Sequence, residues 1–432
     1  MKTNIHPAEQ IVSIMERIYK YEMTTISGGN LSLIDENGDM WITPSGVDKG
    51  NLTVRDIMRL KKDGTAEGIH TPSVELPFHQ GIYEVRPDIK AIVHAHPPAL
   101  VSFSMARKKP NAKLFMNTYK HIAGSMEIAA YAIPGSEALK NNIASQFAKG
   151  GSAVIMENHG LVVGGTNLFE AFHLFEMLEY LARIEINANT IGKTFELTEE
   201  QLKKVNDSGA KQLPVQEKHS QTEEEAQARA AIVQFLKRLY DRKLITSKMG
   251  SLSVKLSDGS ILVTPAHTDR KLISTQDIVH LKEGKCEALK EPCEFYELHE
   301  KMYKEHPEIS SAAVVAPPYL MAYAITEARY NTHIIPEAYV VLRDIGKVPF
   351  DTGSDHYKAV AKKIADNNPV LLVENGYAVV TGGNLLKVFD RIEVAEYSAK
   401  ALVQAKHVGE VINIREEDID AIIQGFKLSA KS

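Results

Sequence analysis

The sequence predicts two tandem copies of one α/β domain, each built on a mixed β-sheet that is covered by helices on both faces. Three observations predict this fold. The chain has 432 residues, which is too long for one ordinary domain. Its second half repeats, in the same order, the motifs of the first half. Within the first half, short apolar runs typical of strands alternate with amphipathic helical segments.

The repeat spans nearly the whole chain with only small changes in spacing. The segment GGNLSL from Gly28 matches MGSLSV from Met249, which lies 221 residues later. Further on, MENHGLVVGG from Met156 resembles VENGYAVVTGG from Val373, which lies 217 residues later. The small drift in spacing indicates short loop deletions, because the order of the motifs does not change.

The junction between the two copies is polar and charged and shows no apolar periodicity, which is the composition of an exposed linker. We therefore predict a first domain over residues 1–208, a linker over 209–224 and a second domain over 225–432.

The elements of the first copy follow from local patterns. An amphipathic stripe from Ile11 to Tyr19 predicts the first helix, and Glu36-Asn37-Gly38 predicts a turn between two strands. The apolar run IKAIVHAH predicts a buried strand. The expected elements are helices over 8–22, 136–149 and 167–190, one helix beginning near Ser73, strands over 89–96, 152–157 and 160–164, and the strand pair.

Composition narrows the class of protein. The formal net charge is −5, whereas a nucleic-acid-binding domain usually carries a basic stripe, so we expect no nucleic-acid partner. No apolar run is long enough to cross a membrane, and the N-terminus lacks the apolar stretch of a signal peptide, so we expect a cytoplasmic protein without membrane attachment. The two cysteines, Cys286 and Cys293, are expected to be reduced thiols.

A histidine pair gives the sharpest chemical signal. His94 and His96 fall on the predicted strand 89–96, where side chains two residues apart point to the same face. His159 follows the apolar strand 152–157, and strand ends in α/β sheets are common places for sites. Three histidines with an open fourth position are typical of catalytic zinc. Neutral imidazole also binds cobalt, manganese or iron, so another divalent transition metal remains open.

Glu75 is the candidate acid–base group. It falls in the first turn of the helix expected near Ser73, where a carboxylate could bind the metal or move a proton. Capping of that helix by its carboxylate is the alternative. Two small-residue segments, Gly28 to Ser32 and Thr43 to Gly46, are candidates for phosphate binding through backbone N–H groups, the alternative being tight turns between strands.

The second copy serves as an internal control. Val314 and Ala316 stand at the positions of His94 and His96, and Phe295 stands opposite Glu75. The segment that matches His159 is Asn375-Gly376, with no histidine. Structural histidines with unrelated roles are not expected to disappear together, so the comparison indicates one metal site, kept only in the first copy. By the same argument His79 is structural, because His299 preserves it.

With these motifs in order, the first copy resembles the class II aldolase/adducin family over about residues 8–205. The matching motifs are Gly29-Asn30-Leu31-Ser32, Thr43-Pro44-Ser45-Gly46, Pro72-Ser73-Val74-Glu75, His94-Ala95-His96 and Asn158-His159-Gly160. The resemblance implies a three-layer α/β/α fold in each copy and a zinc ion on His94, His96 and His159. The second copy resembles the same family without its chemistry, as in adducin.

The resemblance also implies roles for other residues. Asn30, Ser45, Gly46 and Ser73 would hold a substrate phosphate, and Glu75 would be the acid–base residue. Family members use a tyrosine from a neighbouring subunit, for which Tyr119 is the candidate. The fuculose-phosphate enzymes have a second serine where this chain has Val74, so its phosphate contacts are expected to differ.

The activity implied is that of a zinc-dependent class II aldolase-type carbon–carbon lyase, which cleaves a ketose phosphate through a metal-stabilised enediolate. The alternatives are an epimerase, decarboxylase or dehydratase that acts on a sugar phosphate at the same site, or a non-catalytic adducin-like scaffold. Because family enzymes resemble fourfold rings, we expect a homo-oligomer in which a dimer of this two-domain chain mimics the ring.

Overall fold

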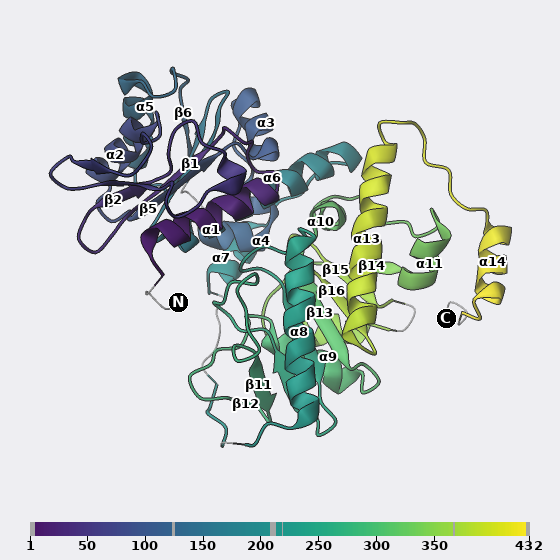
Figure 1. Ribbon diagram of the computed structural model, residues 1–432. Coiled ribbons are helices and arrows are strands. Elements are labelled where there is room, and N and C mark those ends of the chain that lie inside the picture. The colour runs from purple at the N-terminus through teal and green to yellow at the C-terminus, as the bar shows by residue number, and fades with distance from the viewer. Residues whose placement is uncertain (1–4, 123–125, 208–212, 218, 366–367, 429–432) are drawn as a thin grey trace. The chain divides into compact units, whose positions relative to one another are not determined.

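The computed structural model divides into two compact units, each holding one sheet (Figure 1). The first unit comprises Met1–Ala112 and His121–Ala182, and the second comprises Lys113–Lys120 and Arg183–Ser432. The two sheets confirm the tandem α/β fold predicted from the repeat. The structure describes residues 5–122, 126–207, 213–217, 219–365 and 368–428.

The first unit contains a mixed eight-stranded sheet in the order β4-β3-β2-β1-β5-β8-β7-β6. Neighbouring strands run antiparallel, except for the parallel pair β6 and β7. The strands are β1 (Asn30–Ile34), β2 (Met40–Ile42), β3 (Met58–Leu60), β4 (Ala66–Glu67), β5 (Ala91–Ala95), β6 (Met126–Ala129), β7 (Ala153–Met156) and β8 (Gly160–Gly165).

Helices cover both faces of this sheet. On one face, α2 (Leu76–Val85) and α5 (Glu137–Phe147) bury an apolar cluster with strand residues such as Ile92 and Val162. On the other face lie α1 (Pro7–Lys20), α3 (Pro98–Ala106) and α6 (Leu168–Ile191), linked by Arg17 over the Phe172 ring and by the Glu179 carboxylate on the first amides of α3. Short 3₁₀ turns occupy Lys49–Asn51 and Ala112–Leu114.

Most predicted elements of the first copy appear within a few residues of their expected bounds. The apolar stripe of α1 buries Ile11, Met15 and Ile18, as an amphipathic helix requires. The helix expected near Ser73 begins at Leu76, because Glu75 occupies the N-cap position. Its side chain makes no capping hydrogen bond, so the alternative role of Glu75 as a helix cap is wrong.

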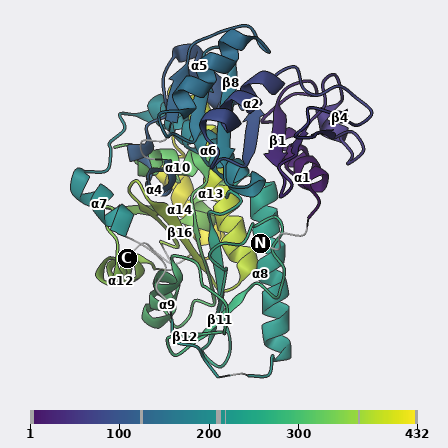
Figure 2. The ribbon, with the colours of Figure 1, turned by 90° about the vertical axis from the view of Figure 1, so that its left-hand side faces the viewer.

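The second unit repeats the sheet order of the first as β12-β11-β10-β9-β13-β16-β15-β14, again with one parallel pair among its described strands, β14 and β15. Figure 2 labels β11, β12 and β16 of this sheet. Its strands are β9 (Ser251–Lys255), β10 (Ile261–Val263), β11 (Val279–Lys282), β12 (Lys285–Cys286), β13 (Ser311–Val315), β14 (Ile345–Val348), β15 (Val370–Val373) and β16 (Tyr377–Gly382). Its helices are α8 (Glu223–Asp241), α9 (Tyr296–Glu305), α10 (Pro318–Ala324), α11 (Pro336–Leu342), α12 (Ser354–Lys363), α13 (Leu385–Ala405) and α14 (Glu416–Gly425).

Part of the first repeat folds with the second unit. The core of that unit includes Met116 from α4 (Met116–Ile122) and Leu202 and Val205 from α7 (Glu199–Asp207). The boundary near residue 208 describes the sequence repeat, whereas the compact units divide the chain elsewhere. Residues 208–212 and 218 of the predicted linker region lie outside the described residues, and Val215 bridges to Cys286.

Two smaller expectations can be compared with the described residues. Cys286 and Cys293 are free, as expected of reduced thiols, and both are buried. Among the helices within the described ranges, none combines the length and the apolar composition needed to span a membrane.

Candidate metal centre

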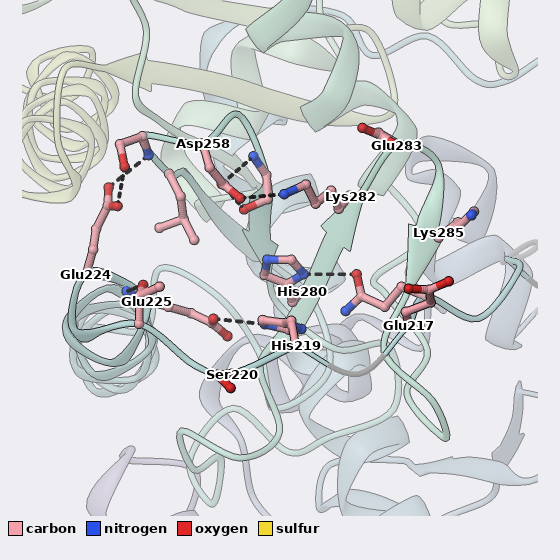
Figure 3. A pocket seen from close by; sticks show the side chains of 15 residues that line it. Glu217, His219, Ser220, Glu224, Glu225, Asp258, His280, Lys282, Glu283 and Lys285 are labelled. Atoms are coloured by element: carbon pink, nitrogen blue, oxygen red, sulfur yellow. Dashed lines mark hydrogen bonds and ion pairs between the residues drawn. The ribbon is translucent and has the colours of Figure 1, made fainter.

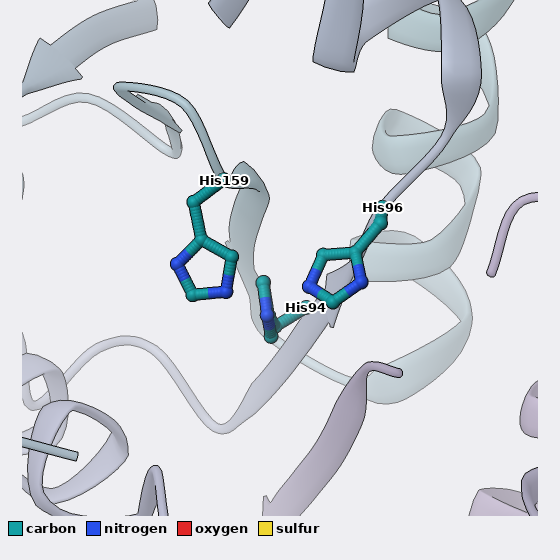
Figure 4. Close-up of side chains that lie close together, drawn as sticks. All are labelled: His94, His96 and His159. Carbon is teal, nitrogen blue, oxygen red and sulfur yellow. The ribbon is translucent and has the colours of Figure 1, made fainter. Parts of the chain in front are cut away.

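The structure brings the three predicted histidines of the first copy together (Figure 4). His94 lies on β5, His96 directly follows that strand, and His159 lies in the turn between β7 and β8. The ring centroids are 4.9 Å, 5.0 Å and 5.1 Å apart, and one ring nitrogen of each histidine lies within 4.8 Å of the others. This is the grouping expected of three ligands that share one ion.

The backbone fixes which nitrogen of His94 can bind a metal. Nδ1 of His94 lies 2.9 Å from the carbonyl oxygen of Leu161 on the paired strand β8. A carbonyl can only accept a hydrogen bond, so Nδ1 carries a hydrogen, and Nε2 carries the lone pair when the ring is neutral. Hydrogen bonds of this kind orient metal-ligating histidines in many sites.

Glu75 faces the histidines from the N-cap of α2. Its Oε2 lies 3.2 Å from Nε2 of His94, and its Oε1 lies 3.5 Å from Nε2 of His159. The Asn30 amide donates to Oε2 at 2.7 Å. Burial alone would raise the pKa of the Glu75 carboxyl, but His94 and His159 in their protonated forms, together with the Asn30 amide, hold that pKa well below its ordinary value. Glu75 is therefore a carboxylate.

The buried lone pairs at this centre fit a cation. In the neutral His94 ring, Nδ1 donates to Leu161, so Nε2 of His94 and Oε2 of Glu75 face each other as two acceptors. Among the described residues, Nε2 of His94, Nε2 of His96 and Oε1 of Glu75 are buried without a hydrogen-bond partner. Burial lowers the pKa of His96 to about 3 and that of His159 to about 4, and His94 adds to both shifts. Neutral imidazoles beside a carboxylate suit a divalent transition metal.

Two glycines provide the space for His96. A Cβ at Gly28 would lie 2.7 Å from Nδ1 of His96, and a Cβ at Gly160 would lie 2.5 Å from the carbonyl oxygen of Ala95 and 2.8 Å from the His96 ring. The sequence argument used both glycines only as parts of motifs. The repeat did hold the signal, because Met249 and Tyr377 replace them in the copy that has Ala316 in place of His96.

His79 supports the site from behind. Its Nε2 lies 2.5 Å from Oδ1 of Asn30 and its Nδ1 lies 2.7 Å from the Ser32 hydroxyl, which also meets Tyr83. In the second copy, His299 makes the same kind of contacts with Ser251, Ser253 and, through Ser253, Tyr303. The structural role predicted for His79 agrees with this shared network. In the first copy the network also orients Asn30 toward Glu75.

Three of the predicted phosphate-binding residues, Ser45, Gly46 and Ser73, lie on two neighbouring loops, and the fourth, Asn30, is the first residue of β1. The amide of Ser45 donates to the carbonyl of Thr71 and the amide of Ser73 donates to the carbonyl of Thr43. Gly46 has a φ of +67° and an open space beside its Cα. The Ser73 hydroxyl accepts the amide of Glu75 at 3.3 Å, which ties this loop to the acid–base candidate.

A buried lysine that the sequence argument missed supports one of these loops. Nζ of Lys49 donates to the carbonyl of Pro44 at 2.5 Å, and burial lowers its pKa. The second copy has Arg270 at this position, where it donates to three backbone carbonyls. A basic residue kept in both copies indicates support of the loop.

Tyr119 lies in the second unit, whereas the histidines lie in the first. It packs against the apolar core of the second unit, as does Phe295, the counterpart of Glu75. Its role across a subunit boundary stays a prediction.

The arrangement defines a class: an α/β domain with a buried three-histidine, one-glutamate centre at the end of its central strands. The family model described as "Class II Aldolase and Adducin N-terminal domain" matches residues 9–186 and again residues 230–403. The chain belongs to this family, with two tandem copies of its domain.

Proteins with stated activities are similar to part of this chain. A 3-oxo-tetronate 4-phosphate decarboxylase of Haemophilus influenzae is 31% identical over 185 residues, which cover 42% of this chain and 88% of that protein. A 5-deoxy-D-ribulose 1-phosphate aldolase of Bacillus thuringiensis is 30% identical over 197 residues, covering 45% and 91%. An L-fuculose phosphate aldolase of Methanococcus maripaludis is 30% identical over 183 residues, covering 42% and 97%.

Among solved structures, an L-fuculose 1-phosphate aldolase matches with a TM-score of 0.43 and 30% identity, over 46% of this chain and 94% of that chain.

Proposed function

We propose that this protein is a metal-dependent lyase that cleaves a ketose phosphate by retro-aldol reaction at the centre in its first domain. One observation carries the proposal: His94, His96 and His159 converge with the carboxylate of Glu75. Nε2 of His94, Nε2 of His96 and Oε1 of Glu75 are buried there without a hydrogen-bond partner among the described residues. The aldolases among its relatives act on sugar phosphates, which supports the substrate class.

The residues would divide the work as follows. A divalent metal, with zinc as our proposal, would be held by the three histidines and would supply Lewis-acid stabilisation of negative charge on the substrate oxygens. Glu75 would deliver the proton to the carbon freed by bond cleavage, or remove it in the reverse direction. The loops of Ser45-Gly46 and Ser73, with Asn30, would hold the phosphate and so orient the reacting bond.

Decarboxylation of a phosphorylated oxo-acid is the second candidate, and the 31% identity to a 3-oxo-tetronate 4-phosphate decarboxylase favours it. Both reactions break a carbon–carbon bond next to a carbonyl and leave negative charge on the same atoms, so one site serves either. Epimerisation and dehydration of a sugar phosphate share that requirement. A non-catalytic adducin-like scaffold would not need the three histidines and the glutamate of the first domain, so these residues argue against it.

Substrate assays on metal-loaded full-length protein distinguish these reactions. We expect release of dihydroxyacetone phosphate or a related three-carbon product from a ketose 1-phosphate, measured by coupled oxidation of a nicotinamide. Carbon dioxide release from 3-oxo-tetronate 4-phosphate without aldol cleavage would favour the decarboxylase. Absence of turnover with all four substrate classes, in protein that carries one metal per chain at this centre, would contradict the proposal.

We further propose that the chain forms a homodimer. Within the second unit, a first-repeat segment docks on the second domain: the amide of Met116 donates to the carbonyl of Asn375, and the Asn375 side chain donates to the carbonyls of Leu114 and Phe195. Asn158 is the first-copy counterpart of Asn375 and shares its φ of 53°. A second chain could therefore dock its own corresponding segment at Asn158.

The segment of the second copy that corresponds to this docking segment carries exposed apolar side chains. Ile412 stands at the position of Phe195 and is 88% exposed, and Phe426, just beyond α14, is 62% exposed. In this dimer, Tyr339, the counterpart of Tyr119, would approach the partner chain's first domain.

The expected result is a dimer in analytical ultracentrifugation that dissociates in I412E/F426E. The control is L386E, which changes an exposed leucine elsewhere in the second unit. A wild-type protein that is monomeric and fully active would overturn the dimer while leaving the catalytic proposal standing.

A further inference from the structure

A second group of metal-ligating side chains lies in the second unit, apart from the family site. His219, Glu225 and His280 each offer one ligand atom, and these atoms lie within 4.8 Å of one another. They line a cavity of about 460 Å³ (Figure 3). They come from three elements: the segment before α8, the first turn of α8 and strand β11. No sequence motif joins them.

The two imidazoles and the carboxylate are in direct contact. Nε2 of His219 lies 3.0 Å from Oε2 of Glu225. The rings of His219 and His280 stack with centroids 4.3 Å apart and an interplanar angle of 29°. Two imidazoles beside a carboxylate are the donors preferred by zinc and its neighbours among the transition metals.

Surrounding residues orient these groups as a metal site requires. Nδ1 of His280 lies 3.1 Å from Oε1 of Gln216, an oxygen that can only accept, so Nδ1 carries the hydrogen and Nε2 the lone pair. His94 is oriented in the same way by Leu161. Arg229 donates to Oε1 of Glu225 at 2.8 Å, which fixes the carboxylate and leaves Oε2 on the side of His219.

The cavity also has the charge that attracts a cation. Its lining contains more carboxylates than lysines: Glu217, Glu224, Glu225, Asp258 and Glu283 against Lys282 and Lys285. Asp258 and Lys282 pair with each other at 2.8 Å, so the remaining carboxylates outnumber the remaining lysine. A divalent ion would therefore enter a region of negative potential.

This group is not a remnant of the catalytic centre. The position of His280 in the first copy is Arg59, which pairs with Asp39 at 2.6 Å. The residues that correspond to the catalytic histidines in the second copy, Val314 and Ala316, are apolar. The cluster is thus a feature of the second copy alone.

We propose that His219, Glu225 and His280 form a second divalent transition-metal site, which fastens the segment between the repeats to α8 and β11. Binding would join residues that precede the second domain to its sheet.

The test uses full-length protein in which H94A/H96A has removed the first site. After removal of metal by a chelator, Co²⁺ or Zn²⁺ alone is titrated in by calorimetry, and the visible spectrum of bound Co²⁺ reports nitrogen ligands. We expect one remaining equivalent per chain and a rise in melting temperature. H280A should lower the affinity at least about 100-fold, and Q216A, which frees the His280 ring, about 10- to 100-fold.

Two further variants keep the test decisive. His219 is an exposed residue, so H219A removes a ligand with little risk to folding, and it should weaken binding as H280A does. The control is H267A, which removes an exposed histidine of the same unit that pairs with Glu291. The proposal would be overturned if H94A/H96A bound no metal, or if H267A lowered the metal affinity as much as H219A does. In that case His219 and Glu225 form only an ion pair.

Discussion

The two copies of the domain place their strands in the same order. Only the first copy, however, gathers metal-binding side chains at the end of its central strand. In the first copy His94, His96 and Glu75 gather there, with glycines beside them. In the second copy the ring of Phe295 lies 4.6 Å from that of Tyr377, within an apolar core that includes Val314. The same backbone therefore carries either a polar centre or a packed core.

The comparison teaches that the polar centre is not needed for folding. Ligands and acid–base residue give way to apolar side chains, and larger residues occupy the positions of the two glycines. Apolar side chains fill the volume that a metal centre occupies in the first copy, so the core of the second copy stays closely packed. The first copy keeps buried lone pairs that cost stability, and sites that cost stability are retained for function.

The largest effect is expected from removing two ligands. H94A/H96A should lose one equivalent of metal per chain, measured by elemental analysis, and at least roughly 10³-fold in kcat/KM, since Lewis-acid stabilisation contributes several kcal/mol. The matched change in the second copy, V314A, should leave activity and metal at the first centre unchanged. Full activity in H94A/H96A would show that the two copies differ for another reason.

The next effect concerns the carboxylate. E75Q should lower kcat by roughly 10²- to 10⁴-fold because it cannot transfer the proton, while the centre formed by His94, His96 and His159 keeps its one equivalent of metal, measured on the same sample. F295L is the control at the matching position of the second copy, and its activity should equal that of the wild type. Loss of that equivalent in E75Q would make Glu75 primarily a ligand.

A smaller effect is expected from one methyl group. G160A places a Cβ against Ala95 and the His96 ring, so that His96 must shift, and metal affinity should fall about 10- to 100-fold in competition with a chromogenic chelator. G383A is the control, because a Cβ there meets nothing within 4 Å. Equal affinities in the two variants would remove the steric explanation for the glycines.

The smallest effect lies in the second copy. The Tyr377 hydroxyl is buried without a hydrogen-bond partner among the described residues, so Y377F should unfold at the same urea concentration as the wild type or a higher one, with a gain of about 1 kcal/mol at most. Y303F instead removes a hydroxyl bonded to Ser253 at 2.7 Å and should lose about 1 kcal/mol. A loss in Y377F as large as in Y303F would mean that Tyr377 retains a polar role.

The sequence predicted most of the first sheet and the convergence of its histidines, because both follow from local periodicity. Strand alternation puts His94 and His96 on one face, and the repeat showed that His159 belongs with them. It did not predict α3, which begins at Pro98, since its apolar residues show little helical periodicity. Nor did it show that Leu202 and Val205 pack into the second unit, because such packing depends on distant surfaces.

The second cluster could not be read from the sequence either. His219 and Glu225 lie in or next to the stretch that composition assigns to a linker, and His280 follows some sixty positions later. Only the pairing of β11 with its neighbours and the start of α8 bring the three side chains together. Lys49 was missed for a different reason, since a lysine in a turn is usually exposed and this one is buried.

The glycines beside His96 also bear on how the second copy could change in evolution. A histidine restored at position 316 would meet the side chains of Met249 and Tyr377, whose counterparts Gly28 and Gly160 leave that space open. Each single reversion would therefore lower the stability of the second copy before a metal site could form. The packing of the second copy therefore opposes the return of a metal site. In descendants of this chain, we expect the surface residues of the second copy to change long before its histidines return.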